Sequence, residues 1–211
     1  MRITSGIFGG RNLAVPKTGD IRPTQDRVRQ ALFSMLMNEV PSCSFLDIFA
    51  GSGAVGLEAY SRGASSVTFV EQNPRHIAVI KQNIESLIPS QIRTSGSSSL
   101  PQTQIRTSGS SSLPQPFQPS LSCIKADAYR WLATFSGRPF DIAFADPPYA
   151  LGEEKGYADF LGTLASRNVI RSGGIFAAEM TSAQTPDEVE GWRLVRERKY
   201  GKTRLCLWMR T

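Results

Sequence analysis

The sequence predicts an α/β fold in which helices cover both faces of an open, mostly parallel sheet. From Phe45 onward, short apolar runs alternate with amphipathic helical stretches, as in right-handed strand–helix–strand crossovers. Two of these runs end in a carboxylate followed by residues that break regular structure, at Asp47 and at Asp146. The chain closes with two runs, 192–199 and 203–209, joined by Tyr200–Lys202, which predict a terminal antiparallel pair.

Residues 1–40 predict an extension ahead of the sheet. Residues 1–20 contain two glycine turns and predict a hairpin or an irregular strand pair. Arg22–Thr24 then starts a helix, with the side chain of Thr24 as its N-cap. We expect Arg27 and Arg29 to point away from the buried face of this helix. That face is predicted by the i, i+3, i+4, i+7, i+8 spacing of Val28, Ala31, Leu32, Met35 and Leu36.

Residues 41–211 predict one domain that carries the sheet. Asn73 and Pro74 give the clearest helix start, because the first is a good N-cap and the second suits the first helical position. Gly63 closes the helix before it. The predicted strands are 45–49, 67–70, 121–125, 140–145, 175–179, 192–199 and 203–209, and the predicted helices are 54–62, 74–87, 128–135 and 157–166.

One segment, residues 89–120, does not follow this alternation. Gln91–Gln102 recurs unchanged as Gln104–Gln115, and the segment is rich in Ser, Pro and Gln. Such a composition buries too little apolar area to offset its ordering entropy, so we expect a flexible insertion. A tandem duplication without function explains the repeat, and a binding arm built on Arg93 and Arg106 is the alternative.

Composition limits the function classes. The chain has 211 residues, of which 40% are hydrophobic, and no apolar run approaches the ~20 residues that cross a bilayer. Its first residues lack the apolar core of a signal peptide. Cys43, Cys123 and Cys206 are far apart and have no metal-like spacing. We therefore expect a cytoplasmic protein without a membrane partner or a metal, and a monomer, since no feature requires a dimer.

The basic residues are concentrated in two places. The net charge is +6, residues 1–40 hold six basic and three acidic groups, and residues 193–204 hold six basic groups against Glu197 alone. Local excesses of this kind favour a polyanionic partner such as nucleic acid. A solvated basic face that aids solubility is the alternative.

A glycine-rich turn follows the first predicted strand. Gly51–Gly56 has the G-x-G-x-x-G pattern and Glu71 lies 20 residues after its first glycine, as in dinucleotide-binding turns. Asp47 would repel a pyrophosphate at this helix start, however, and would attract the ammonium and sulfonium groups of S-adenosylmethionine. Glu71 can accept ribose hydroxyls, and Asp127–Ala128 offers an acceptor for an adenine amine. We interpret the turn as an S-adenosylmethionine site; a dinucleotide site and a purely structural turn are the alternatives.

Asp146-Pro147-Pro148-Tyr149 supplies the chemistry that a methyl donor needs. Two prolines stiffen the backbone and remove two N–H donors, which leaves carbonyl oxygens free to accept. With the Asp146 carboxylate, they can hold both protons of an exocyclic amine and direct its lone pair at the methyl group. The ring of Tyr149 can stack on the base. A proline-stiffened turn with an exposed tyrosine is the bland alternative.

Three motifs together resemble the bacterial small-subunit ribosomal RNA guanine-N(2) methyltransferases: residues 22–29, residues 47–58 and Asp146–Tyr149. The resemblance runs from Gly6 to the C-terminal hairpin. It implies a Rossmann-like, class I S-adenosylmethionine-dependent methyltransferase fold with a seven-stranded mixed sheet of order 3-2-1-4-5-7-6. The implied substrate is one guanine of 16S ribosomal RNA in a partly assembled small subunit. The duplicated segment at 89–120 departs from the family, which has a short connection there.

The resemblance also implies roles for individual residues. Catalysis falls on Asp146, Pro147, Pro148 and Tyr149. Cofactor contacts fall on Asp47, Phe49, Ala50, Gly51, Ser52, Gly53, Glu71, Gln72, Asp127 and Ala128. RNA contacts fall on Arg22, Arg27, Arg29, Lys199, Lys202 and Arg204, for which ordinary surface charge is the alternative.

Three other functions stay open at this stage. A DNA adenine methyltransferase would share the two site motifs, but no segment is large enough for a separate DNA-recognition domain. An NAD-dependent oxidoreductase would leave Asp146–Tyr149 without a role. A non-catalytic RNA-binding assembly factor would retain its activity when Asp146 is replaced.

Overall fold

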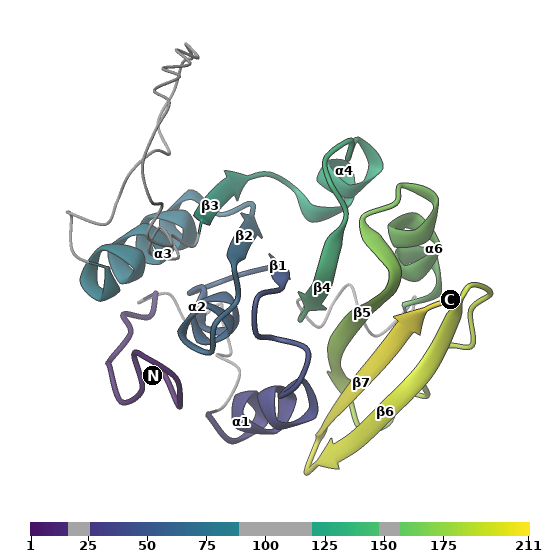
Figure 1. The fold of residues 1–211 in the computed structure, drawn as a ribbon, viewed down its shortest axis with the longest axis horizontal. Helices are drawn as coiled ribbons and strands as arrows, with labels where there is room; N and C mark the ends of the chain where they lie inside the picture. Colours follow the sequence, from purple (N-terminus) through teal and green to yellow (C-terminus); the bar gives the residue numbers. More distant parts are fainter. Residues whose placement is uncertain (17–25, 89–119, 148–156) are drawn as a thin grey trace, which may run out of the picture.

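A computed structural model of the chain describes residues 1–16, 26–88, 120–147 and 157–211 (Figure 1). It contains one seven-stranded sheet whose order confirms the predicted topology and α/β class. The first five strands are parallel, and β7 is antiparallel to both of its neighbours. Across the sheet, the strands are β3 (Ser120–Lys125), β2 (Ser66–Glu71), β1 (Ser44–Ile48), β4 (Phe140–Ala145), β5 (Ile170–Thr181), β7 (Thr203–Arg210) and β6 (Trp192–Tyr200).

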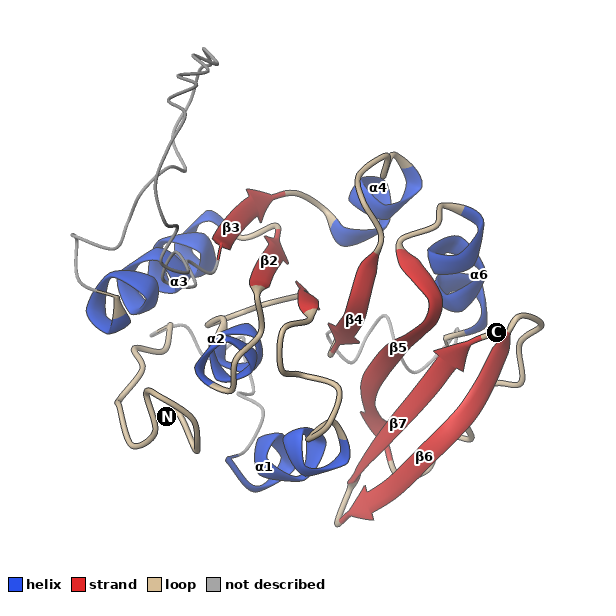
Figure 2. Cartoon of the chain, in the orientation of Figure 1, coloured by secondary structure: helices blue, strands red, loops and turns tan. Residues whose placement is uncertain are grey.

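Helices cover both faces of the sheet, as Figure 2 shows. One apolar cluster unites one face of the sheet with the first three helices, and a second cluster unites the other face with the last two. None of the helices in the described part of the chain is long and apolar enough to span a bilayer. In chain order, the helices are α1 (Asp26–Met35), α2 (Ala54–Ser61), α3 (Pro74–Leu87), α4 (Ala128–Ala133) and α6 (Ala158–Ser166).

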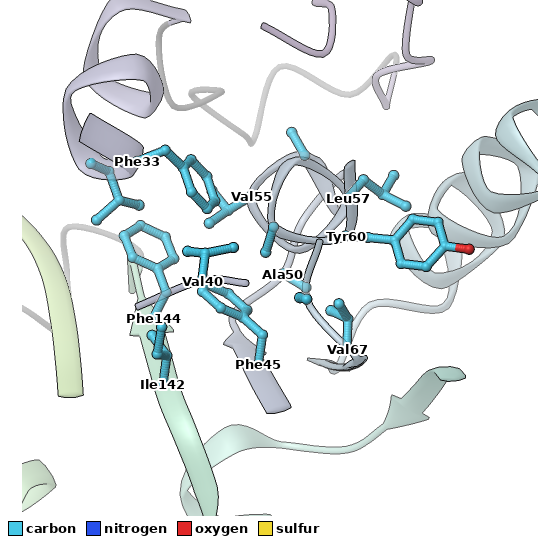
Figure 3. Packing of buried hydrophobic residues seen from close by; sticks show 14 of the residues in the cluster. Phe33, Val40, Phe45, Ala50, Val55, Leu57, Tyr60, Val67, Ile142 and Phe144 are labelled. Atoms are coloured by element: carbon cyan, nitrogen blue, oxygen red, sulfur yellow. The ribbon is translucent and has the colours of Figure 1, made fainter. Parts of the chain in front are cut away.

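Aromatic packing fixes α1 and α2 on the sheet (Figure 3). Phe33 of α1 stacks on Phe45 of β1, and both side chains are fully buried. Burying a side chain of this size contributes about 1.5–3 kcal/mol. Gly56 lets α2 approach β2 closely, since a Cβ at this position would lie 2.3 Å from the ring of Phe69. This packing places the start of α2 at the carboxyl end of β1.

The N-terminal residues 1–16, which we call the N-terminal arm, form a loose hairpin with an antiparallel bridge between Arg2 and Asn12. This agrees with the predicted irregular strand pair as far as residue 16. Its apolar residues Ile3 and Leu13 belong to the same cluster as α1, α2 and α3. The predicted helix start at Arg22–Thr24, and the duplicated segment up to residue 119, lie outside the described residues.

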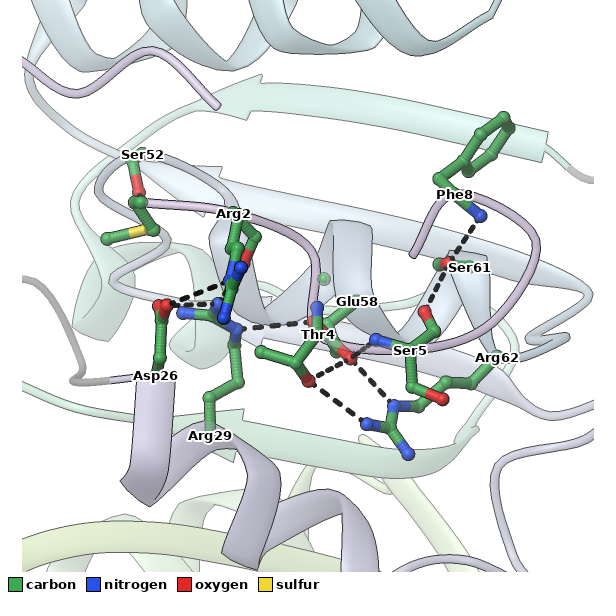
Figure 4. A network of polar contacts seen from close by, with 12 residues as sticks. Arg2, Thr4, Ser5, Phe8, Asp26, Arg29, Ser52, Glu58, Ser61 and Arg62 are labelled. Carbon is green, nitrogen blue, oxygen red and sulfur yellow. Dashed lines mark hydrogen bonds and ion pairs between the residues drawn. The ribbon is translucent and has the colours of Figure 1, made fainter. Parts of the chain in front are cut away.

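Arg29 corrects one prediction. It was expected to point away from the buried face of α1, but its side chain is fully buried and its Nε atom lies 3.3 Å from Oε2 of Glu58. The Nη2 atom of Arg29 lies 3.0 Å from Oδ1 of Asp26, and the carbonyl oxygen of Arg2 accepts a hydrogen bond from the same guanidinium group (Figure 4). The N-terminal arm covers this side of α1, so the helix has a second, polar buried side that apolar spacing does not reveal.

Candidate functional site

The glycine turn (residues 49–53) and Asp146 leave the sheet side by side. β1 and β4 are neighbouring parallel strands, with Asp47 paired to Phe144 and Ile48 paired to Ala145. The next residue of each strand opens the glycine turn on one side and is Asp146 on the other. The chain order reverses between these two strands, which is where open α/β sheets bind their ligands. The structure therefore brings the glycine turn next to Asp146, the first residue of the second motif, as the sequence predicted.

The glycine turn has an unusual backbone. Phe49, Gly51 and Gly53 have φ angles of 61°, 55° and 75°, so three of five consecutive residues are left-handed. Glycine adopts this conformation without strain, whereas for a phenylalanine it costs about 1–3 kcal/mol. The ring of Phe49 is held by contacts with Tyr129 and Phe160, which compensate for this strain.

Asp47 lies beneath this turn. It is 2% exposed, and its Oδ2 atom accepts a hydrogen bond from the Gly56 amide at 2.8 Å, so the carboxyl group braces the first turn of α2. Burial raises the pKa of Asp47 to about 8, and the negative charge of Glu71 adds to this effect. A cation bound at the turn would favour the ionised form of Asp47 and would be attracted by it.

Glu71, at the end of β2, is also buried and is held by several donors. Its Oε2 atom accepts from the Gly51 amide at 2.9 Å, and its Oε1 atom accepts from the Asn73 amide at 2.8 Å. The Nδ1 atom of His76 lies 3.4 Å from Oε1. The carboxylate thus ties the glycine turn to the end of β2 and keeps acceptor capacity at this edge of the sheet.

His76 is buried beside Glu71, although a histidine in the first turn of an amphipathic helix is usually exposed. The side chain is 7% exposed, because it folds back from the first turn of α3 towards Glu71. The side-chain oxygen of Asn73 accepts from the Arg75 amide, which fixes the orientation of the Asn73 amide group. The Asn73 Nδ2 atom then faces His76 Nε2 at 3.3 Å, while Nδ1 of the same ring faces Glu71.

Asp127 and Ala128 follow β3 at the same edge. Asp127 caps α4 by accepting a hydrogen bond from the Arg130 amide at 2.9 Å, and Ala128 is buried. The next residue, Tyr129, is 43% exposed and contacts Phe49 edge-on. Sequence reasoning missed Tyr129, although its place two residues after Asp127 marks it as part of this rim.

Asp146 and Pro147 are half-buried at the end of β4. Tyr157, at the start of α6, is buried and donates a hydrogen bond from its hydroxyl group to the carbonyl oxygen of Glu179 at 2.9 Å. Burial raises the pKa of Tyr157 well above its usual value, and the negative charge of Asp146 adds to this effect. A neutral tyrosine hydroxyl therefore lies within electrostatic reach of Asp146, a neighbour that the sequence did not indicate. Pro148 and Tyr149 lie outside the described residues.

The predicted RNA-contacting residues divide into two groups. Arg27, Lys199 and Lys202 are exposed. Arg29 and Arg204 are buried, which contradicts the expectation that they face RNA. Arg204 lies on β7, between β5 and β6, where it pairs with Glu197 at 2.7 Å. Because β7 lies between two other strands, the side chain of Arg204 packs against their residues and is shielded from solvent. Arg22 is outside the described residues.

The turn between β6 and β7 lies at the same edge of the sheet as Asp146. β5 runs parallel to β4 and ends at Thr181, which pairs with Thr203 at the start of β7. The exposed Lys202 is in the turn just before Thr203. The sheet register therefore places this basic turn on the side where Asp146 leaves β4.

Comparisons with known proteins match this chain over nearly its whole length. The family model described as "Conserved hypothetical protein 95" matches residues 1–113 and 115–209. The ribosomal RNA small subunit methyltransferase D of Escherichia coli is 30% identical over 100% of this chain and 90% of its own length. The protein of the same name from Haemophilus influenzae is 30% identical over 95% of this chain and 89% of its own length.

The chain belongs to the ribosomal RNA small subunit methyltransferase D family. The solved structure of the yhhF protein of Escherichia coli agrees with this family's fold, with a TM-score of 0.73, 27% identity and coverage of 100% of this chain and 97% of that chain. A Thermus thermophilus 16S rRNA N2 G1207 methyltransferase, solved with AdoMet and guanosine, has a TM-score of 0.59 at 18% identity and shows the shared fold alone. The family resemblance and the class I methyltransferase fold that the sequence predicted are both confirmed.

Proposed function

We propose that this chain transfers a methyl group from S-adenosylmethionine to the exocyclic amine of one guanine in 16S ribosomal RNA, within a small-subunit assembly particle. One observation carries the proposal: the register of β1 against β4 sets the acidic glycine turn directly beside Asp146. Membership of the ribosomal RNA small subunit methyltransferase D family supports the same reaction class and the same kind of substrate.

The residues at the turn fit this cofactor. The buried carboxylates of Asp47 and Glu71 suit a ligand that is cationic and carries ribose hydroxyls, and they oppose a pyrophosphate. Three of the predicted cofactor contacts lie on the turn, at Ala50, Gly51 and Gly53. Two others, at Asp127 and Ala128, follow the end of β3. The bound cofactor supplies an electrophilic methyl group on its sulfonium.

Asp146 and the proline carbonyls then act on the amine. As acceptors, they would hold its two protons and direct the nitrogen lone pair at the methyl group, so that the new N–C bond would form as the bond from methyl to sulfur breaks. Positive charge that develops on the nitrogen meets acceptors already in place, and the proton leaves afterwards. Tyr149 provides the stacking surface for the guanine.

The exposed basic residues complete the proposal. Lys199, at the end of β6, and Lys202, in the β6–β7 turn, would contact RNA phosphates near Asp146. Arg27 would contact them from α1. The reassignment of Arg29 and Arg204 to buried ion pairs removes them from this surface.

The test is methyl transfer from radiolabelled S-adenosylmethionine to separate pools of 16S RNA, small-subunit assembly particles and DNA. We expect label in a ribosomal pool as N2-methylguanosine, and a loss of about 100-fold or more in kcat for Asp146→Asn. Asp141→Asn, at the opposite end of the same strand, is the matched control and should retain activity. Label in DNA alone would overturn the substrate assignment, and full activity of Asp146→Asn would overturn the catalytic one.

A further inference from the structure

Asn83 of α3 joins the N-terminal arm to the glycine turn. Its side chain is 1% exposed and makes three hydrogen bonds to the backbone of these two distant segments. Oδ1 accepts from the Ala14 amide at 2.7 Å, and Nδ2 donates to the Ala14 carbonyl oxygen at 3.0 Å. The same Nδ2 donates to the carbonyl oxygen of Ser52 at 3.0 Å.

Only a primary amide of this length satisfies all three partners. The Ala14 amide needs an acceptor, while the carbonyl oxygens of Ala14 and Ser52 both need donors. An aspartate would keep the acceptor but set its second oxygen against two carbonyl oxygens. Ser52 is 6% exposed, so its carbonyl group would then lack a partner in a place where water is scarce.

The arm has a second anchor on α2, the helix that the glycine turn opens (Figure 4). Glu58 accepts from the Thr4 amide at 2.7 Å, from the Thr4 hydroxyl at 2.6 Å and from the Ser5 amide at 3.0 Å. Within the arm, the Leu13 amide donates to the Met1 carbonyl oxygen at 2.9 Å. The two anchors and this internal bond make the arm one unit that rests on both the turn and its helix.

We propose that Asn83 is a positioning residue that couples docking of the N-terminal arm to the shape of the glycine turn. This inference rests on the proposed function, because it takes the turn to be the cofactor site. The turn holds the strained Phe49 and two left-handed glycines, so its shape depends on neighbouring contacts. By whatever factor the docked arm raises the affinity of the turn for its ligand, ligand binding then favours docking of the arm, since thermodynamic coupling is reciprocal.

This coupling would also affect the N-terminal residues that we propose to contact RNA. The arm continues in sequence through residues 17–25 to α1, which carries the exposed Arg27. Cofactor binding would thus order the arm that leads to this helix. Occupied enzyme should present a better ordered N-terminal region to RNA than empty enzyme.

The experiment follows amide hydrogen exchange in residues 1–16 with and without S-adenosylhomocysteine, alongside calorimetric measurement of its Kd. For the unmodified chain, we expect the ligand to slow exchange throughout the arm. For Asn83→Asp, we expect the Kd to rise about tenfold and the ligand-dependent slowing to disappear.

Two further variants separate positioning from general destabilisation. Gln82→Asp makes the same charge change at an exposed position of the same helix and should keep both the Kd and the slowing. Leu164→Ala lowers Tm from the opposite apolar cluster and should also keep both.

Ligand binding by the unmodified chain with no change in arm exchange would overturn the coupling, and this measurement decides even where Asn83→Asp does not fold. An unchanged Kd in Asn83→Asp, or an equal rise in Leu164→Ala, would overturn the positioning role. Failure of the unmodified chain to bind S-adenosylhomocysteine would overturn the proposed function itself, and the inference with it.

Discussion

Replacing Asp47 with asparagine is expected to stabilise the empty fold and to weaken binding of a cationic cofactor. The substitution keeps an oxygen that can accept the 2.8 Å hydrogen bond from the Gly56 amide. It removes a carboxyl group whose pKa burial raises from 3.8 to about 8. The two effects have opposite signs because the fold opposes the charge that the cofactor requires.

The magnitude follows from the pKa difference. The unfolded chain ionises Asp47 above pH 3.8, whereas the fold keeps it protonated until about pH 8. The contribution of Asp47 to stability is therefore highest below pH 3.8, and it is lost as the pH rises towards 8. With about 1.4 kcal/mol per pKa unit, the loss reaches about 4 kcal/mol at pH 7. The variant lacks this loss, and its advantage should grow by about 3 kcal/mol between pH 5 and pH 7.

Urea unfolding of the ligand-free chain at pH 5 and pH 7 measures this difference, and calorimetry with S-adenosylmethionine should show a Kd raised at least about tenfold at pH 8. Asp141→Asn is the control of opposite sign. Burial raises the pKa of Asp141, but hydrogen bonds from Arg171 and Ser44 outweigh it, so the net pKa is lowered. Its stability contribution is lost as the pH falls. A stability difference between Asp47→Asn and the parent that is equal at both pH values would refute the reasoning.

Two further predictions concern the reassigned and the retained basic residues. Arg29→Met should lower the free energy of unfolding by about 1–3 kcal/mol, because it removes one of the two arginines that pair with the buried Glu58 and leaves Arg62 alone. The exposed Gln30→Met should change it by less than about 0.5 kcal/mol. Urea unfolding measures both, and a loss no larger than that of Gln30→Met would contradict the buried pair. Lys202→Glu should weaken RNA binding at every sequence and reduce the salt slope by about 1–2, measured by fluorescence anisotropy of a 16S fragment. Arg167→Glu, at the other edge of the sheet, should not, and an equal effect of both would argue against the proposed RNA side.

The strands and helices of the parallel part could be predicted because their signals are local, whereas the order of all seven strands was implied by the family resemblance. Each crossover repeats an apolar run and an amphipathic helix, and the predicted strand 140–145 coincides with β4. The glycine turn, Glu71 and Asp146 were placed at one edge for the same reason, since parallel strands share their carboxyl ends. Asn73 and Pro74 marked the start of α3 correctly through capping chemistry alone.

The buried polar residues could not be predicted in the same way. Apolar spacing identifies the side of a helix that faces the sheet, but it does not identify buried polar side chains. Arg29 is buried by its contact with Glu58, His76 by its contact with Glu71, and Arg204 by its place on an inner strand. One partner of Arg29 is Glu58, which lies 29 residues away on another helix. A charged residue on an amphipathic helix is usually exposed, so only the three-dimensional contact distinguishes this exception. The roles predicted for Arg22, Pro148 and Tyr149 stay predictions.

The buried polar groups share one physical task. Asp47, Glu71 and Asn83 each hydrogen-bond to the backbone of the glycine turn or of the first turn of α2, from β1, from β2 and from α3 respectively. A turn with a left-handed Phe49 would relax if any of these bonds were missing, since local sequence does not favour its shape. Two of the three groups are carboxylates, whose burial is costly without a cation nearby. At the proposed cofactor site, a positively charged ligand would compensate these two carboxylates, which would make the site selective for that charge.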